Sequence, residues 1–409
     1  MKNAVRAQLC SMMFLEFFIW GAWFVTLGTF LGSNLQATDG EIALAFSTQS
    51  WGAIIAPFVI GIIADRYFNA ERILGVLHLL GAVLMYLMYE SSAFEGFYIL
   101  VLAYMIVYMP TLALVNSVSF NQMKNPAKEF SLVRVFGTLG WIVAGLSISF
   151  IFHWDKGESI EQGFLKNTFL MTALASLLLG LFSFTLPKTP PKVIRSKNVT
   201  IKEILGLDSL GLFKDRNFLV FFLSSVLICI PLAFYYQNAN PFLVEIGMDN
   251  ATGKMTIGQI SEIAFMLLLP YFFTKFGFKK TILVAMGAWV LRYMLFAYGD
   301  VNELGFMLII GIALHGICYD FFFVSGQIYT DSKAGEAYKS SAQGLITLAT
   351  YGIGMLIGFW IAGKISTWYL LEDGTHIWKT IWMYPAGFAF VVFVLFAIFF
   401  KTEKIDYQS

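Results

Sequence analysis

Charged side chains within long apolar segments are the first sign of chemistry in this sequence. The segment GQISEIAF carries Gln259 and Glu262, which lie three residues apart and therefore on one face of a helix. The segment HGICYDFF carries Asp320. A charge at the centre of a bilayer costs about 2.5–3.5 kcal/mol on insertion scales, so it is rarely placed there without a function. These carboxylates predict a polar interior among otherwise apolar helices.

Further polar residues in the apolar segments extend this interior. They are Glu16, Asn116, Arg134, Gln237, Asn238, Asn240, Arg292 and His315. Because lipid tolerates none of them, we expect them to face water or one another. Each also has a structural interpretation. Arg134 can extend to the membrane surface, Glu16 can hydrogen-bond between helices, and Arg292 can be the ion-pair partner of Asp320.

Aromatic residues accompany these polar groups. Trp20 lies in FFIWGAW, Tyr236 in AFYYQNANPF, and Tyr319 precedes Asp320. Tyr and Trp rings stack on planar ligands while their polar tips form hydrogen bonds. Amides, rings and one or two carboxylates suit an uncharged, hydroxylated ligand with a flat ring or a sugar face. A polyanion such as a nucleotide needs several inward-facing arginines, and Arg134 is the one plausible candidate.

The composition indicates a polytopic membrane protein. Of 409 residues, 58% are hydrophobic and 13% are charged, and the mean hydropathy is +0.72. Soluble domains are nearer half apolar and a quarter charged. The three cysteines all fall in apolar segments, which argues against a disulfide framework. The first apolar run is too long for a cleaved signal peptide.

A bilayer core needs about 20 apolar residues in a helix. This length predicts an all-α protein with twelve membrane-spanning helices, at about 8–32, 48–66, 72–90, 96–121, 131–153, 166–187, 217–243, 255–275, 280–298, 303–329, 340–368 and 378–401. The spans divide into two six-helix bundles. Residues 1–187 form the first, 188–216 a basic linker, and 217–409 the second. Within the linker, IKEILGLDSLGLF is predicted to be a short amphipathic helix on the membrane surface.

The distribution of positive charge gives the orientation. Most of the 27 lysines and arginines fall in alternate loops, which marks those loops as cytoplasmic. Both termini and the linker are then expected to be cytoplasmic, and the protein is expected to cross the membrane several times.

The two halves resemble each other weakly, which predicts an internal repeat. Pro57 and Pro270 occupy equivalent places in spans two and eight, and spans five and eleven are both rich in glycine. Small residues let helices pack closely in lipid. In repeated transporters the ligand binds between the repeats near the middle of the membrane, so we expect the site there.

Sequence motifs resemble a known transporter family. GIIADRYFNAERI looks like the conserved cytoplasmic loop of the major facilitator superfamily. Over nearly the full length the chain resembles the nucleoside:H⁺ symporter family. The resemblance is carried by FFIWGAWFVTLGTF, YMPTLALVNSVSF, RVFGTLGW, GQISEIAF, LRYMLFAYGD, YDFFFVSGQIY and SSAQGL. It implies a major facilitator fold and proton-driven uptake of nucleosides.

The family motifs imply roles for individual residues. Those at substrate-facing positions are Arg134, Thr138, Trp141, Gln259, Glu262, His315 and Tyr319, with Glu262 suited to the ribose hydroxyls. The stretch FYYQNANPF matches only at its end, although we expect Trp20, Tyr236, Gln237 and Asn240 also to bind substrate. His315 stands where the family's bacterial nucleoside permease has a tyrosine, and Glu16 where it has an amide.

The coupling proton requires a carboxylate whose pKa changes as its surroundings alternate between buried and hydrated. We place it on Asp320, deep in span ten, with Glu262 and then Glu16 as competitors. Glu262 is expected to bind substrate directly and is therefore less free to titrate alone. No cofactor other than the proton, no metal and no nucleic acid is expected, and the protein is expected to be a monomer in the lipid bilayer.

Other functions remain open at this point. A proton-coupled sugar or oligosaccharide symporter uses the same amide, carboxylate and aromatic chemistry, and a membrane sensor on a transporter fold is a further alternative. An enzyme is not expected, because P-loop, HExxH and GxSxG motifs are missing from the sequence.

Overall fold

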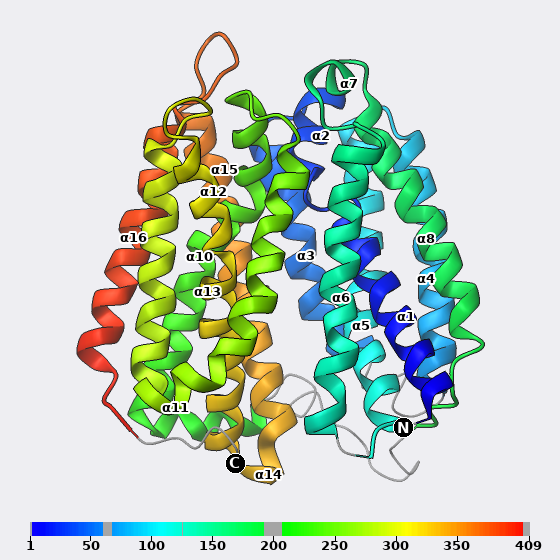
Figure 1. Ribbon diagram of the computed structural model, residues 1–409, viewed down its shortest axis with the longest axis vertical. Coiled ribbons are helices and arrows are strands. Elements are labelled where there is room, and N and C mark those ends of the chain that lie inside the picture. Colours follow the sequence, from blue (N-terminus) through cyan, green and yellow to red (C-terminus); the bar gives the residue numbers. More distant parts are fainter. Residues whose placement is uncertain (1, 60–67, 125, 192–206, 404–409) are drawn as a thin grey trace. The chain divides into compact units, whose positions relative to one another are not determined.

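The computed structural model describes residues 2–59, 68–124, 126–191 and 207–403 (Figure 1). Over these ranges the chain is helical, apart from loops and an isolated bridge between Leu370 and His376. Nine helical segments of the described chain are long and apolar enough to cross a membrane. The all-α class is therefore confirmed, and the number of twelve spans stays a prediction.

The chain forms two compact units. Unit 1 contains Met1–Thr200 together with Asp249–Thr256, and unit 2 contains Ile201–Met248 together with Ile257–Ser409. The motif GIIADRYFNAERI lies largely outside the described residues, and so does most of the predicted linker. The described end of the proposed amphipathic segment, Leu207–Lys214, is a 3₁₀ helix.

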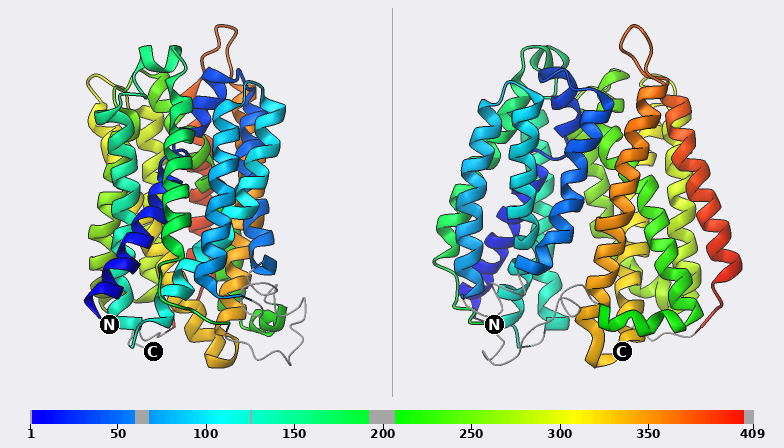
Figure 2. Two further views of the ribbon diagram at one scale, coloured as in Figure 1. Left: turned by 90° about the vertical axis from the view of Figure 1, so that its right-hand side faces the viewer. Right: turned by 180° about the vertical axis from the view of Figure 1, so that it is seen from behind.

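In unit 1, α1 lies along α6, α4 along α8 and α3 along α5 (Figures 1 and 2). The elements are α1 (Asn3–Gly21), α2 (Leu27–Asn34), α3 (Asp39–Val59), α4 (Ala70–Glu90), α5 (Phe94–Asn121), α6 (Pro126–Leu146), the π-helical turn η2 (Ser147–Ile151), α7 (Gly157–Glu161), the 3₁₀ turn η3 (Phe164–Lys166) and α8 (Asn167–Ser183).

In unit 2, α10 packs against α15 and α16. The elements are the 3₁₀ helix η4 (Leu207–Lys214), α10 (Arg216–Glu245), α11 (Ala251–Tyr298, of which residues 251–256 belong to unit 1), α12 (Gly305–Ala313), α13 (His315–Tyr319), the π-helical turn η5 (Asp320–Val324), α14 (Ser325–Thr347), the π-helical turn η6 (Leu348–Gly354), α15 (Met355–Trp368) and α16 (Trp378–Phe399).

The second span begins earlier than hydropathy predicted. Helix α3 starts at Asp39 instead of residue 48. Its start is fixed by a capping box, in which the Thr38 backbone N–H donates to Glu41 Oε2 at 2.8 Å and the Glu41 N–H donates to Thr38 Oγ1 at 3.3 Å. Hydropathy alone does not detect this signal, because the capping residues are polar.

One predicted loop is helical instead, whereas another is present as a break. α11 consists of two helices that meet at a kink at Gly277, where φ is 77°, so predicted spans eight and nine are separate helices. Glycine adopts this backbone conformation without a Cβ clash. α14, in contrast, runs through the predicted gap between spans ten and eleven. The sequence SKAGEAYKSSAQ there is polar but contains good helix formers, so hydropathy ended the spans too early.

Glycines bring equivalent helix pairs into close contact in the two units. In unit 1 a Cβ at Gly140 of α6 would lie 2.1 Å from the Phe14 carbonyl oxygen of α1. In unit 2 a Cβ at Gly358 of α15 would lie 2.8 Å from the Ile230 carbonyl oxygen of α10. Span five thus packs on span one as span eleven packs on span seven, which agrees with the predicted repeat.

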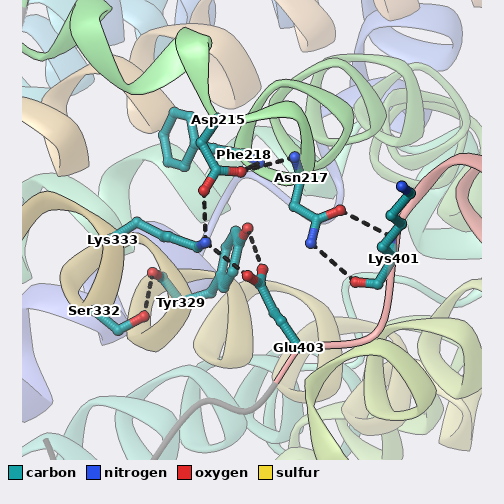
Figure 3. A network of polar contacts seen from close by, with 8 residues as sticks. All are labelled: Asp215, Asn217, Phe218, Tyr329, Ser332, Lys333, Lys401 and Glu403. Atoms are coloured by element: carbon teal, nitrogen blue, oxygen red, sulfur yellow. Dashed lines mark hydrogen bonds and ion pairs between the residues drawn. The ribbon is translucent and has the colours of Figure 1, made fainter.

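A polar network closes one end of unit 2 (Figure 3). Lys333 Nζ of α14 lies 2.7 Å from Asp215 Oδ2 and 2.7 Å from Glu403 Oε2. Asp215 also accepts from the backbone N–H of Asn217 and caps α10. The Tyr329 hydroxyl donates to Glu403 at 2.8 Å. The network ties the start of α10 to α14 and to the chain that follows α16.

Candidate functional site

An aromatic cluster lies at the end of α1 in unit 1. The Trp20 ring centre is 5.7 Å from that of Tyr108 on α5 and 5.6 Å from that of Trp141 on α6, both in edge-on geometry. Trp141 lies against the backbone of Gly21, where a Cβ would be 2.9 Å from its ring. The buried Trp20 Nε1–H has no hydrogen-bond partner among the described residues. The cluster offers ring faces and a free donor.

One face of α6 carries the three residues that the family motif placed there. Arg134, Thr138 and Trp141 follow the spacing i, i+4 and i+7. The Arg134 guanidinium lies 4.1 Å from the ring centre of Phe17 on α1, and its Nη1 has no hydrogen-bond partner in the described parts of the chain. Thr138 is buried. A half-buried cation and an aromatic cluster therefore share this face.

Span one is discontinuous next to this cluster. α1 ends at Gly21 and α2 begins at Leu27, with a turn between them. Broken membrane helices are typical of transporter binding sites, because the interrupted backbone exposes polar groups. The motif FFIWGAWFVTLGTF therefore encodes a break where hydropathy predicted one helix.

Glu16 is fully buried four residues before Trp20. Its Oε1 lies 2.6 Å from the Thr111 hydroxyl, and its Oε2 lies 2.8 Å from His78 Nε2. These contacts join α1 to α5 and α4. The structural interpretation of Glu16 as a hydrogen-bonding partner between helices therefore agrees with these contacts.

In unit 2, α11 and α13 cross at two glycines. A Cβ at Gly316 would lie 2.6 Å from both the Glu262 backbone nitrogen and the Ser261 carbonyl oxygen. The Gly316 N–H donates to Ser261 Oγ at 3.0 Å. A Cβ at Gly258 would lie 3.1 Å from the His315 Cβ. This close crossing brings two separate motifs, GQISE and HGICYDFF, to one place.

His315 and Arg292 form a buried stack with Tyr235. The ring centres of His315 and Tyr235 are 5.5 Å apart in stacked geometry. The guanidinium carbon of Arg292 lies 3.4 Å from the Tyr235 ring centre, and Arg292 Nη1 lies 3.2 Å from His315 Nδ1. Arg292 is fully buried. It thereby fixes the ring of His315 next to α11.

Tyr236 lies near Tyr319 and near the buried carboxylate of Glu262. The Tyr319 hydroxyl is 2.9 Å from that of Tyr351. Tyr236 interacts electrostatically with Tyr319, Glu262 and Arg292. Four of the predicted residues, from α10, α11 and α13, therefore gather in unit 2: Tyr236, Glu262, His315 and Tyr319.

The amides of α10 are buried as well. Gln237 and Asn240 are 1% and 2% exposed, and Gln259 on α11 is half-buried. Gln237 Oε1 has no hydrogen-bond partner among the residues described. Asn238, in contrast, donates to Ser366 Oγ on α15 at 3.2 Å, which is a structural contact. Gln237 therefore presents an acceptor inside the unit.

Asp320 is fully buried and begins the π-helical turn η5. Such turns are frequent at functional sites. Another π-helical turn of unit 2, η6, carries Tyr351, the partner of Tyr319. The backbone is therefore irregular at Asp320, the residue expected to carry the proton. It is also irregular at Tyr351, which contacts Tyr319, the residue before Asp320.

Sequence reasoning missed several residues that contact the predicted ones. They are Phe17, Tyr108, Thr111, Ser261 and Tyr351. Two of them, Tyr108 and Thr111, lie in the family motif YMPTLALVNSVSF, so the motif could have identified them. Amides, aromatic rings and carboxylates are side chains that can bind ligands and protons. Among the described residues there is no group of three or more His, Cys, Asp or Glu that could hold a metal ion.

These features define a multi-pass membrane transporter of the major facilitator fold. A crystal structure of the nucleoside transporter NupG matches the chain with a TM-score of 0.88 and 29% identity, covering 97% of this chain and 100% of that one. A sequence profile of the nucleoside H⁺ symporter family matches residues 1–405, so the chain belongs to this family. The resemblance read from the motifs is confirmed.

Curated relatives agree. The protein YegT of Escherichia coli K12 is 44% identical over 402 residues, which cover 97% of this chain and 93% of YegT. The xanthosine permease of the same organism is 33% identical over 426 residues, which cover 99% of both chains. Permeases of this kind are transporters and not enzymes, as the sequence predicted.

Proposed function

We propose that the protein imports nucleosides together with protons by alternating access across the bacterial cytoplasmic membrane. The observation that carries this proposal is the family match over residues 1–405. The buried carboxylates, amides and rings within each unit support it, because they suit an uncharged, hydroxylated ligand. The charge bias of the loops supports cytoplasmic termini.

Substrate contacts are proposed from both units. Unit 1 offers the ring faces of Trp20 and Trp141 for the base, and Arg134 and Thr138 as polar partners. In unit 2, Glu262 is the acceptor proposed for the ribose hydroxyls. Further contacts are proposed for Tyr236, Gln237, Asn240, Gln259, His315 and Tyr319.

The coupling proton is proposed to bind Asp320. A buried carboxylate disfavours its charged form, and hydration reverses this, so alternation between the two states takes up and releases a proton. The complete burial of Asp320 and the π-helical turn that it begins support the assignment. Glu262 and Glu16 are the competing carboxylates. The proton is the coupling ion, and no other cofactor is proposed.

Purified protein in proteoliposomes tests this function. Labelled uridine, adenosine and xanthosine should accumulate when the outside is acidic, and a protonophore should abolish the accumulation. Labelled sucrose, raffinose and melibiose should not accumulate. Sugar uptake without nucleoside uptake would replace the proposal with the sugar symporter, and uptake that ignores the pH gradient would remove proton coupling.

A further inference from the structure

Unit 1 contains a buried pair of titratable groups apart from the proposed coupling carboxylate Asp320. Glu16 on α1 and His78 on α4 are 0% and 1% exposed. His78 Nε2 lies 2.8 Å from Glu16 Oε2, and His78 Nδ1 lies 3.4 Å from the hydroxyl of Ser176 on α8. Three helices therefore meet at two groups that can each gain or lose a proton.

The hydrogen count of this network favours a bound proton. Thr111 has one hydroxyl hydrogen, yet its Oγ1 lies 2.6 Å from Glu16 Oε1 and 2.5 Å from the Tyr108 carbonyl oxygen. If Glu16 carries a proton on Oε1, it donates that proton to Thr111, and Thr111 donates its own to Tyr108. Both short contacts are then hydrogen bonds. Without this proton, the single hydrogen of Thr111 must serve two acceptors.

The other oxygen of Glu16 fits the same state. Oε2 accepts from the Nε2–H of a neutral His78, and His78 Nδ1 accepts from the Ser176 hydroxyl. The pair is then uncharged. Loss of one proton leaves a net negative charge in a buried site, which is unfavourable unless a cation compensates it. The geometry therefore favours the uncharged pair.

The groups that face the pair are mostly neutral. α5 contributes the hydroxyls of Tyr104 and Tyr108, which both interact electrostatically with Glu16. α8 contributes Ser176. A cation, Arg134 of α6, interacts electrostatically with Tyr108. Arg134 is also a proposed substrate contact. The same cation would therefore lie near the substrate and near the Glu16–His78 pair.

Tyr108 connects the pair to the aromatic cluster. Its hydroxyl donates to the Glu16 carbonyl oxygen at 2.8 Å, and its ring lies edge-on to Trp20 at 5.7 Å. Trp20 follows Glu16 by four residues and therefore lies on the same face of α1. A shift in the position of the Glu16 segment is thus transmitted directly to Trp20.

We propose that Glu16 and His78 form a second proton-binding site, in unit 1, whose proton fixes α1 against α4 and α5. This inference goes beyond nucleoside transport and applies to the protein without substrate. A proton taken from water binds the carboxylate–imidazole pair and returns to water when it leaves, so the exchange needs no other reactant.

The pH dependence of thermal stability of the purified protein, measured without nucleoside from pH 5 to pH 8, tests this site. Stability depends on pH wherever a group binds protons differently in the folded and unfolded states. Glu16→Gln and His78→Asn each dismantle the pair. For each variant the Tm difference from wild type should therefore change by at least about 2 °C across the range. Ser183→Ala, which removes a buried hydroxyl that donates to the Leu179 carbonyl oxygen, should show a constant difference.

If both variants lose the same Tm at every pH, the contact between Glu16 and His78 is a structural hydrogen bond without a proton-binding role. This outcome would overturn the proposal. Asp320→Asn should keep the effect, because Asp320 belongs to unit 2, so failure of the proposed coupling is distinguishable from failure here. If neither variant folds, wild-type protein with ¹⁵N-labelled histidine provides the second test. With the signals of His153, His315 and His376 assigned by substitution, the remaining His78 signal must change with pH. An unchanged signal overturns the proposal.

Discussion

At the scale of single residues, Glu262 is a buried carboxylate next to the glycine crossing of α11 and α13. Glu262→Ala should weaken nucleoside binding about 10- to 100-fold, because a charge-assisted hydrogen bond contributes about 1.5–3 kcal/mol. Calorimetric titration with uridine measures this. Glu303→Gln, an exposed carboxylate before α12, should leave the affinity unchanged. Equal affinity in wild type and Glu262→Ala would remove Glu262 from the site.

A substitution of Asp320, also a single residue, should separate nucleoside binding from proton coupling. Asp320→Asn imitates the protonated acid, so the variant should bind nucleoside and exchange it across the membrane. It should not concentrate nucleoside on a pH gradient, because it has no proton to release. Counterflow and gradient-driven uptake in proteoliposomes compare the two activities. Full accumulation by this variant would assign coupling to Glu262 or Glu16.

At the scale of helices, Gly316 sets the distance between α13 and α11. A Cβ there would lie 2.6 Å from backbone atoms of Ser261 and Glu262, so Gly316→Ala must displace one helix. We expect at least a tenfold loss of uridine affinity, since Glu262 and His315 move apart. Gly287→Ala, in α11 with no atom within 4 Å of the added Cβ, is the matched control and should bind normally. Normal binding by Gly316→Ala would show that the crossing does not position the site.

The network of Figure 3 makes a second prediction at this scale. Burial raises the pKa of Asp215. Hydrogen bonds from Lys333 and from the backbone N–H of Phe218 lower it, and together the lowering effects are larger, so the pKa lies below its ordinary value of 3.8. Because the pKa of Asp215 is lower in the folded than in the unfolded protein, its ionised form stabilises the fold at pH values above the unfolded-state pKa. This contribution is lost as the pH falls through the folded-state pKa.

Lys333→Met removes the main hydrogen-bonding cause of this shift. It should lower stability by about 1 kcal/mol or less at pH 7, because the pair is partly exposed. The deficit should shrink as the pH falls towards 3. Thermal unfolding across pH 3–7 measures this, with Lys214→Met, a nearby exposed lysine, as the control. A deficit that grows in acid would contradict the assignment of the ion pair.

At the scale of the whole molecule, the positive-charge bias predicts which loops face the cytoplasm. The three native cysteines are free and buried, as the sequence predicted. They should therefore react little with a maleimide, and an introduced cysteine can be labelled selectively. Glu158→Cys in α7 should react with an impermeant maleimide in intact cells, whereas Lys214→Cys in η4 should react only after the cells are opened. The reverse pattern would invert the proposed topology and the cytoplasmic position of the termini.

The sequence by itself determined the all-α membrane class of the protein, the position of most of its long apolar helices and the identity of its polar groups. Composition and hydropathy depend only on which residues occur in order, and the cost of burying charge in lipid singles out Glu16, Glu262 and Asp320. Motif resemblance added the family. Polar helical stretches such as the start of α3 and the middle of α14 were missed, because hydropathy does not register capping or helix propensity.

Only the tertiary structure decided which of these groups meet. The stack of His315 on Tyr235 and Arg292, the pairing of Tyr319 with Tyr351, and the bond between Glu16 and His78 join residues far apart in the chain. Such contacts depend on the rotation and separation of packed helices. Glycines such as Gly316, where an added Cβ would lie 2.6 Å from backbone atoms of α11, permit the close approach. A one-dimensional pattern shows that a helix has a polar face, but the partner of that face follows from packing.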